Sequence, residues 1–442
     1  MFDVKKFTLG FILLFILCSA LVSLLKINVA KAEPKTIVVP DDYLTIGWAI
    51  GNASEGDTIF VKKGTYEEHS LVVNKTLSLV GEDADSTIIK DIDPEFISTE
   101  FPPINSVTIK INSNGIKISG LTLTGGALGV AGSGVGTQIV GNIIIAPYGC
   151  INLKGSNQTI AQNTIKNPYP ASGTYSSGYG IHIRGSYNSI IANSIVGANS
   201  DSITLEGESN VVYGNAITDA TNGILVNGNI NIIAKNNVTV IGGGIYIDNG
   251  SYNAVYANRI TDGGGLAVIR GYNNTFYANY VANNMVGATI GGSQDELNYE
   301  TEGPWTSNNR VYHNNFINNE VQVNTDWVVY GTDYFDDGKE GNYWSNYVGT
   351  DNNGDGIGDT PYVIDANRTD RYPLMAPFDI SSITIQLPDW ASPLFTSSLE
   401  PQQSEPFPTT LLVAAIAIIA VVGVALLVYF ATVRKTTGEV EK

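Results

Sequence analysis

An asparagine recurs at a nearly fixed spacing through the middle of the chain, each time in a sequence rich in isoleucine and valine. Most successive positions lie 21 or 22 residues apart, and insertions near residues 168–178 and 291–306 account for the longer gaps. A fixed period of this length predicts a solenoid in which each repeat forms one coil. The positions are Asn142, Asn163, Asn193, Asn215, Asn236, Asn258, Asn279 and Asn314.

Each repeat also contains short stretches in which apolar residues alternate with other residues, such as Ile181-His182-Ile183 and Ile203-Thr204-Leu205. Alternation places the outer residues of each triplet on one face of a β-strand. Glycine and asparagine interrupt the pattern too often for helices, and the frame of leucine-rich repeats is absent. The sequence therefore predicts an all-β fold, a single-stranded parallel β-helix of eight to ten coils with 21–22 residues each.

The asparagine column has a physical explanation in such a fold. A side-chain amide at the same turn of every coil can bond to the amides above and below it, as in other stacked sheets. Asparagine also tolerates the left-handed backbone that tight turns require. Asp219 and Asp262, each four residues after its asparagine, are expected in turns. We therefore interpret the column as scaffold.

The two ends of the chain differ from the repeats. Residues 1–32 resemble an export signal with an Ala30-Lys31-Ala32 cleavage site, and an uncleaved anchor is the alternative. An amphipathic helix over Tyr43–Ala53 is expected to cover the open strand edges. The predicted order is a signal peptide (1–32), an N-terminal cap with the first coils (33–110), β-helix repeats (111–323), a C-terminal cap with an Asp-rich loop (324–378), a linker (379–409), a transmembrane helix (410–433) and a cytoplasmic tail (434–442).

The predicted location depends mainly on the C-terminal apolar run. Leu411 to Phe430 is uninterrupted and long enough to span a bilayer. Arg434 and Lys435 follow it, which predicts a single-pass cell-membrane protein with a cytoplasmic tail and an extracellular or periplasmic β-helix. The net charge of −18 argues against nucleic-acid binding through a basic surface. Seven Asn-x-Ser/Thr sequons are consistent with a glycosylated exterior.

The sharpest local motif is the Asp-rich loop at residues 351–359. Its oxygen-bearing side chains and one backbone carbonyl have the spacing of a calcium loop, although Tyr362 stands where a bidentate carboxylate is usual. The loop predicts a structural Ca²⁺ site, and an ordinary turn without an ion is the alternative. The expected ligands are Asp351, Asn353, Asp355, Ile357 and Asp359.

Catalytic candidates come from the outward side of the coils. Counting back nine residues from successive asparagines gives Lys154, Arg184, Glu206, Asn227, Asn249 and Arg270. A lyase needs a base beside an acidic cluster, and a glycosidase needs two carboxylates on one face. Arg184, Glu206 and nearby Asp201 come closest to either arrangement. Charges stacked on adjacent coils also form ordinary solvated ladders, so both interpretations remain.

Aromatic residues concentrate before and within the predicted C-terminal cap. Trp305, Trp327, Tyr343 and Trp344 have amide and carboxylate neighbours, which suits stacking against sugars. Packing within the cap is the alternative. A copper site is not expected, because copper prefers soft or imidazole ligands and the cysteine, histidine and methionine residues are scattered.

Three segments carry a resemblance to known families. Thr36 to Tyr43, Gly56 to Ile59 and Val61 to Glu67 resemble the start of pectate-lyase-like right-handed β-helices. The repeats resemble those of NosD-type proteins and of carbohydrate-binding and sugar-hydrolysis (CASH) domains, and Gly341 to Leu374 is similar to the ending of archaeal NosD-like surface proteins. The resemblance covers about residues 35–378. It implies a right-handed β-helix, but no lyase motif matches residue by residue.

These observations lead to three functional hypotheses. The first is an exported, membrane-anchored β-helix that binds a polysaccharide or another cell-surface polymer without catalysis. The second is a polysaccharide lyase or glycoside hydrolase with its substrate along the coils. The third follows from the resemblance alone: an accessory protein for maturation of an envelope copper enzyme.

Overall fold

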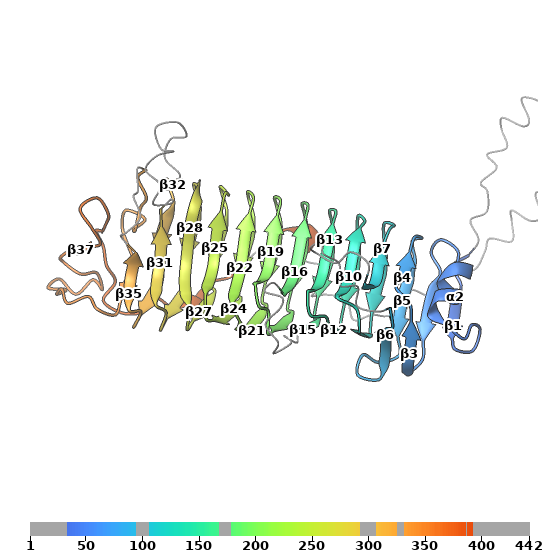
Figure 1. Cartoon of the computed structure of the whole chain (residues 1–442). Helices are drawn as coiled ribbons and strands as arrows, with labels where there is room; N and C mark the ends of the chain where they lie inside the picture. The colour runs from blue at the N-terminus through green and yellow to red at the C-terminus, as the bar shows by residue number, and fades with distance from the viewer. Residues whose placement is uncertain are drawn as a thin grey trace, which may run out of the picture. The chain divides into compact units, whose positions relative to one another are not determined.

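The computed structural model describes residues 33–93, 106–167, 178–291, 306–324, 331–385 and 387–391. The chain divides into two compact units, residues 1–391 and 392–442, and all described residues belong to the first. In this unit, short parallel strands pass through three sheets in turn and stack coil upon coil (Figure 1). The predicted all-β parallel β-helix is confirmed, and its right-handed sense stays a prediction.

Each of the three sheets, which we name A, B and C, contains twelve strands. The chain therefore has more coils than the predicted eight to ten, because residues before the first repeat asparagine and after the last also form coils.

Sheet A contains β1 (Thr36–Val39), β2 (Thr58–Val61), β5 (Ser78–Gly81), β8 (Lys117–Ser119), β11 (Gln138–Val140), β14 (Thr159–Ala161), β17 (Ser189–Ile191), β20 (Val211–Tyr213), β23 (Ile232–Ala234), β26 (Ala254–Tyr256), β29 (Thr275–Tyr277) and β33 (Arg310–Tyr312). Sheet B contains β3 (Gly64–Glu68), β6 (Thr87–Asp91), β9 (Thr122–Thr124), β12 (Ile143–Ile145), β15 (Thr164–Lys166), β18 (Ser194–Val196), β21 (Ala216–Ala220), β24 (Asn237–Val240), β27 (Arg259–Thr261), β30 (Tyr280–Ala282), β34 (Asn315–Ile317) and β36 (Tyr343–Trp344).

Sheet C contains β4 (Leu71–Val73), β7 (Val107–Ile111), β10 (Leu128–Ser133), β13 (Gly149–Lys154), β16 (Tyr179–Arg184), β19 (Asp201–Glu206), β22 (Asn222–Asn227), β25 (Gly243–Asp248), β28 (Gly264–Tyr272), β31 (Val286–Ile290) and β35 (Val321–Asn324), with β32 (Thr306–Ser307) beside β28. Outside these sheets lie an antiparallel pair, β37 (Tyr362–Val363) and β38 (Thr369–Asp370), and 3₁₀ turns at Ile380–Ser382 and Asp389–Ala391.

The core is a stack of β-branched side chains inside the coils. In sheet A, for example, Ile139, Ile160 and Ile190 occupy the central position of successive strands and are fully buried. Strand pairing in register brings each isoleucine directly over the next, where the branched side chains pack well on the pleated surface. Replacing one of them by alanine would cost about 2–5 kcal/mol of stability.

The predicted asparagine ladder is confirmed at the corner between sheets A and B. At each step, the backbone N–H and the side-chain Nδ2 of one asparagine donate to Oδ1 of the asparagine one coil later. In Asn236, for example, the backbone N lies 2.9 Å and Nδ2 lies 3.0 Å from Asn258 Oδ1. The Nδ2 also donates to the Val212 carbonyl at 3.0 Å. These buried amides satisfy the turn's polar groups where water cannot reach them. The ladder runs from Asn142 through all eight repeat positions to Asn342.

A second ladder, which the sequence analysis missed, lies at the corner between sheets C and A. It begins at Gln158, continues through Asn188, Asn210, Asn231, Asn253, Asn274 and Asn309, and ends on the carboxylate of Asp333. The signal was present, because most of these asparagines precede the members of the first ladder by five residues. Two ladders therefore fix both edges of the C-terminal part of sheet A.

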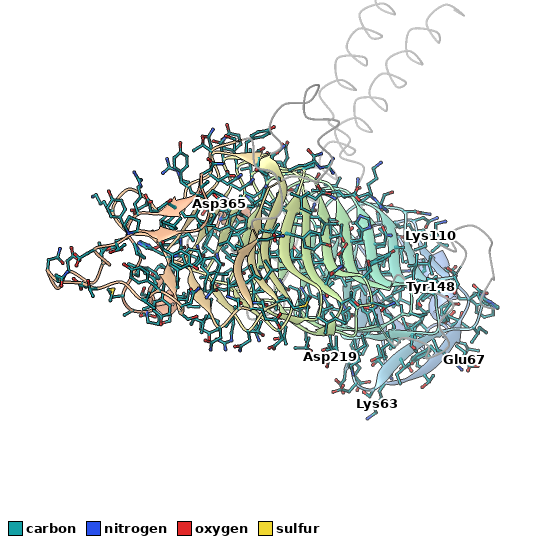
Figure 2. The ribbon with its side chains drawn as sticks, turned by 60° about the vertical axis from the view of Figure 1, so that its left-hand side comes forward. Lys63, Glu67, Lys110, Tyr148, Asp219 and Asp365 are labelled. Carbon is teal, nitrogen blue, oxygen red and sulfur yellow. The ribbon has the colours of Figure 1, made fainter. Side chains whose placement is uncertain are left out.

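We expected the ladder asparagines to adopt the left-handed backbone. The residue before each asparagine adopts it instead. Ala192, Lys235 and Ala257 have φ values of 53°, 52° and 54°. This conformation is unfavourable for residues with a side chain, and the ladder bonds on the next residue hold it in place. Asp262, with φ of 70°, lies in a bend as predicted. Asp219, with φ of 52°, lies instead within β21, where the strand register shifts, and it projects at the edge of the coils (Figure 2).

The predicted N-terminal helix is present as α2 (Ile46–Asn52) at the first coil (Figure 1). Ile46, Ala49 and Ile50 form its buried face. The Glu68 carboxylate accepts the Ile46 N–H at 2.6 Å, and the Lys75 ammonium donates to three carbonyls at the other end of the helix. Opposite charges thus occupy the helix ends that favour them. The capping role stays a prediction.

The predicted signal peptide and transmembrane helix lie outside the described residues. Within the residues that are described, no helix is both long and apolar enough to cross a membrane. Part of the linker predicted at 379–409, the described residues up to Ala391, belongs to the first unit, and Ala391 is buried.

Candidate functional site

The three catalytic candidates lie together on the outward side of sheet C. Strand pairing places Lys154, Arg184, Glu206 and Asn227 in one row, as predicted from their spacing. A neighbouring row contains Lys110, Ala131, Asn152, His182 and Thr204, and Lys110 lies toward the N-terminal end of the solenoid (Figure 2). We name this surface the sheet C face and define it by Asn152, Tyr179, His182, Arg184, Asp201, Glu206 and Tyr246.

One position of the predicted row is wrong. Asp248, rather than Asn249, is the partner of Arg270, and the Arg270 Nε donates to Asp248 Oδ1 at 2.9 Å. The strand register shifts between Ile247 and Asp248, and Asn249 follows in a left-handed turn. Counting residues back from the ladder cannot detect such an irregularity.

Arg184 forms the cationic part of the sheet C face. Its Nη2 donates to Asn152 Oδ1 at 2.7 Å, and the Asn152 Nδ2 donates to the Tyr179 hydroxyl at 2.6 Å. The Tyr179 ring lies over Gly149, where any side chain would collide with it. Burial raises the pKa of Tyr179. Among the described residues Arg184 has no ion-pair partner, so its charge is available to an anionic group.

His182 and Glu206 pair across neighbouring coils, with His182 Nε2 2.8 Å from Glu206 Oε1. Burial lowers the pKa of His182, and Arg184 lowers it further, although the bond to Glu206 acts in the opposite direction. The imidazole is therefore favoured in its neutral form. The ring also meets Tyr179 edge to face at 5.8 Å. A neutral histidine held by a carboxylate can accept a proton, which is one requirement of a general base.

Asp201 lies on β19, the strand that also carries Glu206, and accepts hydrogen bonds from three side chains, of which Thr204 Oγ1 is the most distant at 3.5 Å. The Tyr246 hydroxyl donates to Asp201 Oδ1, and the Asn222 Nδ2 donates to the same oxygen at 3.2 Å. Burial raises the pKa of Tyr246, and the bond to Asp201 raises it further. Asp201 and Glu206 therefore have different partners, and each carboxylate is already hydrogen-bonded within the protein. The sequence analysis missed His182, Tyr179 and Tyr246, because their pairing depends on side-chain direction rather than on spacing.

The aromatic candidates do not form one surface. Trp305 and Trp327 lie outside the described residues, and Tyr343 is half-buried on β36. Trp344 is 1% exposed and is stacked between Phe316 and Tyr362, at 4.5 Å from each ring. Its Nε1 donates to the buried Asp370 at 2.8 Å. The alternative of packing within the cap is therefore correct for Trp344, which has no ring face left for a sugar.

The predicted calcium ligands lie in an exposed loop that is closed by its own hydrogen bonds. The Asp351 carboxylate accepts the N–H groups of Gly354, Asp355 and Gly356. Asp359 accepts from Asn352, and Asp355 accepts from Ile357 and from the Asn353 amide. Such bonds order the loop but do not by themselves bind an ion, so calcium stays a prediction.

A copper site requires clustered nitrogen or sulfur ligands, and the available ligands do not fit this requirement. His69, His182 and His313 lie on different coils, each within 2.8 Å of a different carboxylate. Burial raises the pKa of the Cys150 thiol to about 12, which disfavours a thiolate ligand. In the part of the chain that is described, no three His, Cys, Asp or Glu side chains are grouped to hold a metal ion.

A cavity of about 490 Å³ lies far from the sheet C face, between α2 and the turn from β3 to β4. Trp48, His69 and Ile92 are among its lining residues. It contains none of the predicted site residues. Lys63 and Glu67 mark this N-terminal end of the solenoid (Figure 2).

Comparison with known families and structures gave matches of two kinds. Residues 50–308 match the family described as periplasmic copper-binding protein (NosD). Among curated proteins, none matches the chain. Similar solved structures include the A-module of the Azotobacter vinelandii mannuronan C-5 epimerase AlgE6, with 12% identity, a TM-score of 0.44 and coverage of 64% of this chain and 90% of that chain. The PL6 family alginate lyase AlyGC has 14% identity, a TM-score of 0.47 and coverage of 78% and 57%.

Proposed function

Since the chain belongs to the NosD family of parallel β-helix proteins, we propose that it binds an extended polysaccharide or a similar surface polymer along the sheet C face. The protein would be exported and held at the membrane by residues 410–433, with the β-helix outside the cell. In this proposal the solenoid is a rigid support, and the sheet C face carries the binding groups.

The observation that supports this proposal is the hydrogen-bonded network across neighbouring coils of sheet C. Asn152, Arg184, His182, Glu206 and Asp201 each already have a protein partner. Side chains that support one another in this way present fixed donors and acceptors, which lowers the entropy lost on binding. The same pairing favours binding over catalysis, since each group would first have to leave its partner to act on a substrate.

Binding can be tested with the purified full chain against a polysaccharide array. We expect Arg184→Ala to weaken binding about tenfold or more, because it removes both the hydrogen bond to Asn152 and a charge that has no ion-pair partner among the described residues. Lys235→Ala, at an exposed turn on another side of the coils, is the matched control. Unchanged binding by the Arg184 variant would contradict the proposal.

A second candidate, a polysaccharide lyase or hydrolase, is favoured by the His182–Glu206 pair beside Tyr179 and Arg184. A neutral imidazole next to a cation could remove a proton from a bound sugar acid. If the protein is an enzyme, incubation with its ligand will release unsaturated or reducing ends, and His182→Ala or Glu206→Ala will abolish that release. A ligand that binds and stays intact excludes this candidate.

The third candidate, an accessory protein for a copper enzyme, is supported by the family match. The described nitrogen and sulfur donors do not fit a copper site, so the role would have to operate without copper held by them. Deleting the gene in its natural host tests this candidate. Normal activity of the host's envelope copper enzymes would contradict it.

We also propose that the Asp-rich loop binds a structural calcium ion. The support is the set of oxygen groups between Asp351 and Asp359 and their spacing. Calcium that binds only the folded state stabilises it, by an amount that grows with the logarithm of the free calcium concentration. A chelator should therefore lower the melting temperature. A melting temperature that is the same with and without chelator would remove calcium from the proposal.

A further inference from the structure

The outward side of sheet A changes character halfway along the solenoid. In the first half it carries exposed polar residues such as Lys117 and Gln138. From β17 onward one of the two outward rows is entirely aliphatic or aromatic, namely Ile191, Tyr213, Ala234, Tyr256, Tyr277 and Tyr312. Ile191 and Ala234 in this row and Val211 in the other row have exposed fractions of 2%, 0% and 0%. Outward side chains of a sheet are buried only when another element covers them.

The segment placed to cover these positions is the end of the first unit, residues 378–385 and 387–391, which we name the strap. At one end, Phe378 stacks on His313 at 4.4 Å and exchanges two hydrogen bonds with the Asn315 side chain. At the other end, Trp390 meets Tyr187 edge to face at 5.9 Å. Tyr187 directly precedes Asn188, a member of the second ladder, which is followed by β17. The strap therefore runs back across sheet A from β33 to β17.

Beneath the first part of the strap lies a row of aromatic rings. Tyr256, Tyr277 and Tyr312 occupy the same outward position on β26, β29 and β33. The rings of Tyr277 and Tyr312 are 5.0 Å apart, and Phe378 of the strap lies 6.0 Å from Tyr277. Tyrosine combines an apolar ring face with a polar tip, which suits ligands that present both kinds of surface, such as sugars.

The middle of the strap is a 3₁₀ turn that bonds mainly to itself. The side chain of Asp379 accepts hydrogen bonds from Ser381, and the Ser382 hydroxyl donates to the Asp379 carbonyl, so this 3₁₀ turn satisfies its own polar groups. Ser381, Ser382 and Thr384 are exposed. Two hydrogen bonds and ring contacts hold Phe378, and a ring contact holds Trp390, so release of one end should loosen the segment.

We propose that the row of Tyr256, Tyr277 and Tyr312 is a second carbohydrate-binding surface, which the strap occupies as a displaceable internal competitor. This inference takes its ligand class from the proposed function but depends on different residues. A ligand competing with the strap binds only the open fraction of the molecules, so its apparent affinity rises when the strap is weakened.

The test compares the full chain with a Trp390→Ala variant. Hydrogen exchange should show faster exchange over residues 387–391, which confirms release of that end. Binding is then measured with laminarin, mannan and sodium alginate as probes. We expect at least one probe to bind about three- to tenfold more tightly to the variant. Trp48→Ala, which removes an exposed indole far from the strap, is the matched control and should change nothing.

The second arm assigns the gain to the tyrosines. Adding Tyr256→Leu and Tyr277→Leu to Trp390→Ala preserves an apolar surface but removes the rings, so the gain in affinity should disappear. Unchanged affinity for every probe after proven release of the strap would overturn the inference, and so would a gain that survives the leucine substitutions. Neither result bears on binding at the sheet C face. That binding is tested separately, with Arg184→Ala in the otherwise unchanged chain.

Discussion

Sheets A and C have the same inner side and different outer sides. Inside, both contribute fully buried isoleucine, leucine and valine, such as Ile190 and Ile183. Outside, the middle of sheet C carries Arg184, His182 and Glu206, which hydrogen-bond to one another or to neighbours. Sheet A instead carries Ile191, Val211 and the tyrosine row, and the strap covers it. Inward residues therefore form the core of the coil, and outward residues determine which protein segment or ligand each sheet can contact.

The two sheets also differ in how their edges are held. Sheet A lies between the two long ladders, so buried amides fix the turns on both sides. At the corner between sheets B and C, the described ladder bonds join Asn284 to Asn319 and Gly263 to Asn284. We infer that sheet A is the more rigid of the two.

The largest expected effect comes from breaking a ladder at the edge of sheet A. Asn236→Ala removes the acceptor of Asn215 and leaves the Asn258 oxygen and the Val212 carbonyl without this donor. Buried polar groups without partners cost about 1–3 kcal/mol each, so we expect a loss of about 4 kcal/mol, measured by denaturant unfolding. The neighbouring exposed Asn237→Ala should cost about 0.5 kcal/mol or less. Similar midpoints for both variants would mean that the ladder contributes little.

The next effect concerns the point where that ladder ends. The last ladder residue is Asn342, whose backbone N–H donates to the buried carboxyl of Asp370 at 2.7 Å. Burial raises the pKa of Asp370 from 3.8 to about 6, even though three hydrogen bonds act in the opposite direction. Folding therefore favours the protonated form. That contribution is fully present below pH 3.8 and is lost as the pH rises through about 6, which amounts to about 3 kcal/mol.

Asp370→Asn should accordingly remove this loss between pH 4 and pH 7. The measurement is the free energy of unfolding of both proteins across that range, compared as a difference so that Asp336 and Arg371, which are present in both, cancel. Asp355→Asn, in the exposed loop, is the control and should follow the unsubstituted chain. A constant difference between the Asp370 variant and the unsubstituted chain would rule out titration of Asp370 in this range.

A smaller effect tests the contrast between the outer sides directly. Ile191→Ala on sheet A removes an outward side chain that is only 2% exposed, and we expect a loss of about 2 kcal/mol. Leu225→Ala on the outward side of sheet C, where the residue is half-buried, should cost about 1 kcal/mol or less. Thermal unfolding of the two variants side by side measures the difference. Equal losses would show that sheet A is not covered more completely than sheet C.

The sequence predicted the part of this molecule that repeats. The period of the asparagines determined the coil, the ladder and the row from Lys154 to Asn227, because strand pairing in register keeps residues of equal spacing together. It could not place Asp248, since a single register shift breaks the count. The Tyr246–Asp201 bond spans two coils and depends on side-chain direction. Trp344 has the composition of a sugar platform but the surroundings of a core residue.

The strap was missed for a different reason. Most of its residues fall in the linker predicted at 379–409, although Ile380, Ile383 and Leu387 are aliphatic. The signal that could have found it lies elsewhere, in the outward positions of sheet A. Val211, Ile232 and Ala254 stand where Lys117 and Gln138 stand in earlier coils. An apolar outer side on a solenoid predicts a cover, but the sequence does not say which segment provides it.

The smallest expected effect on stability belongs to the sheet C face. Glu206→Gln retains a hydrogen-bonding group for His182 but removes its charge. Glu206 is 44% exposed in its side chain, so we expect a change of about 0.5 kcal/mol or less in stability. The pKa of His182, which burial already lowers, should fall further because the carboxylate no longer favours the imidazolium.

Stability from the neutral imidazole is present above pH 6.5 and is lost as the pH falls below it, because the unfolded chain takes up the proton more readily. NMR titration of His182 measures the shift, and His69, which pairs with Asp93 on another coil, is the internal control. A His182 pKa that rises in the variant would mean that Glu206 does not act on this ring as a charged partner. The sheet C face would then lose the pairing on which its use as a preformed binding surface depends.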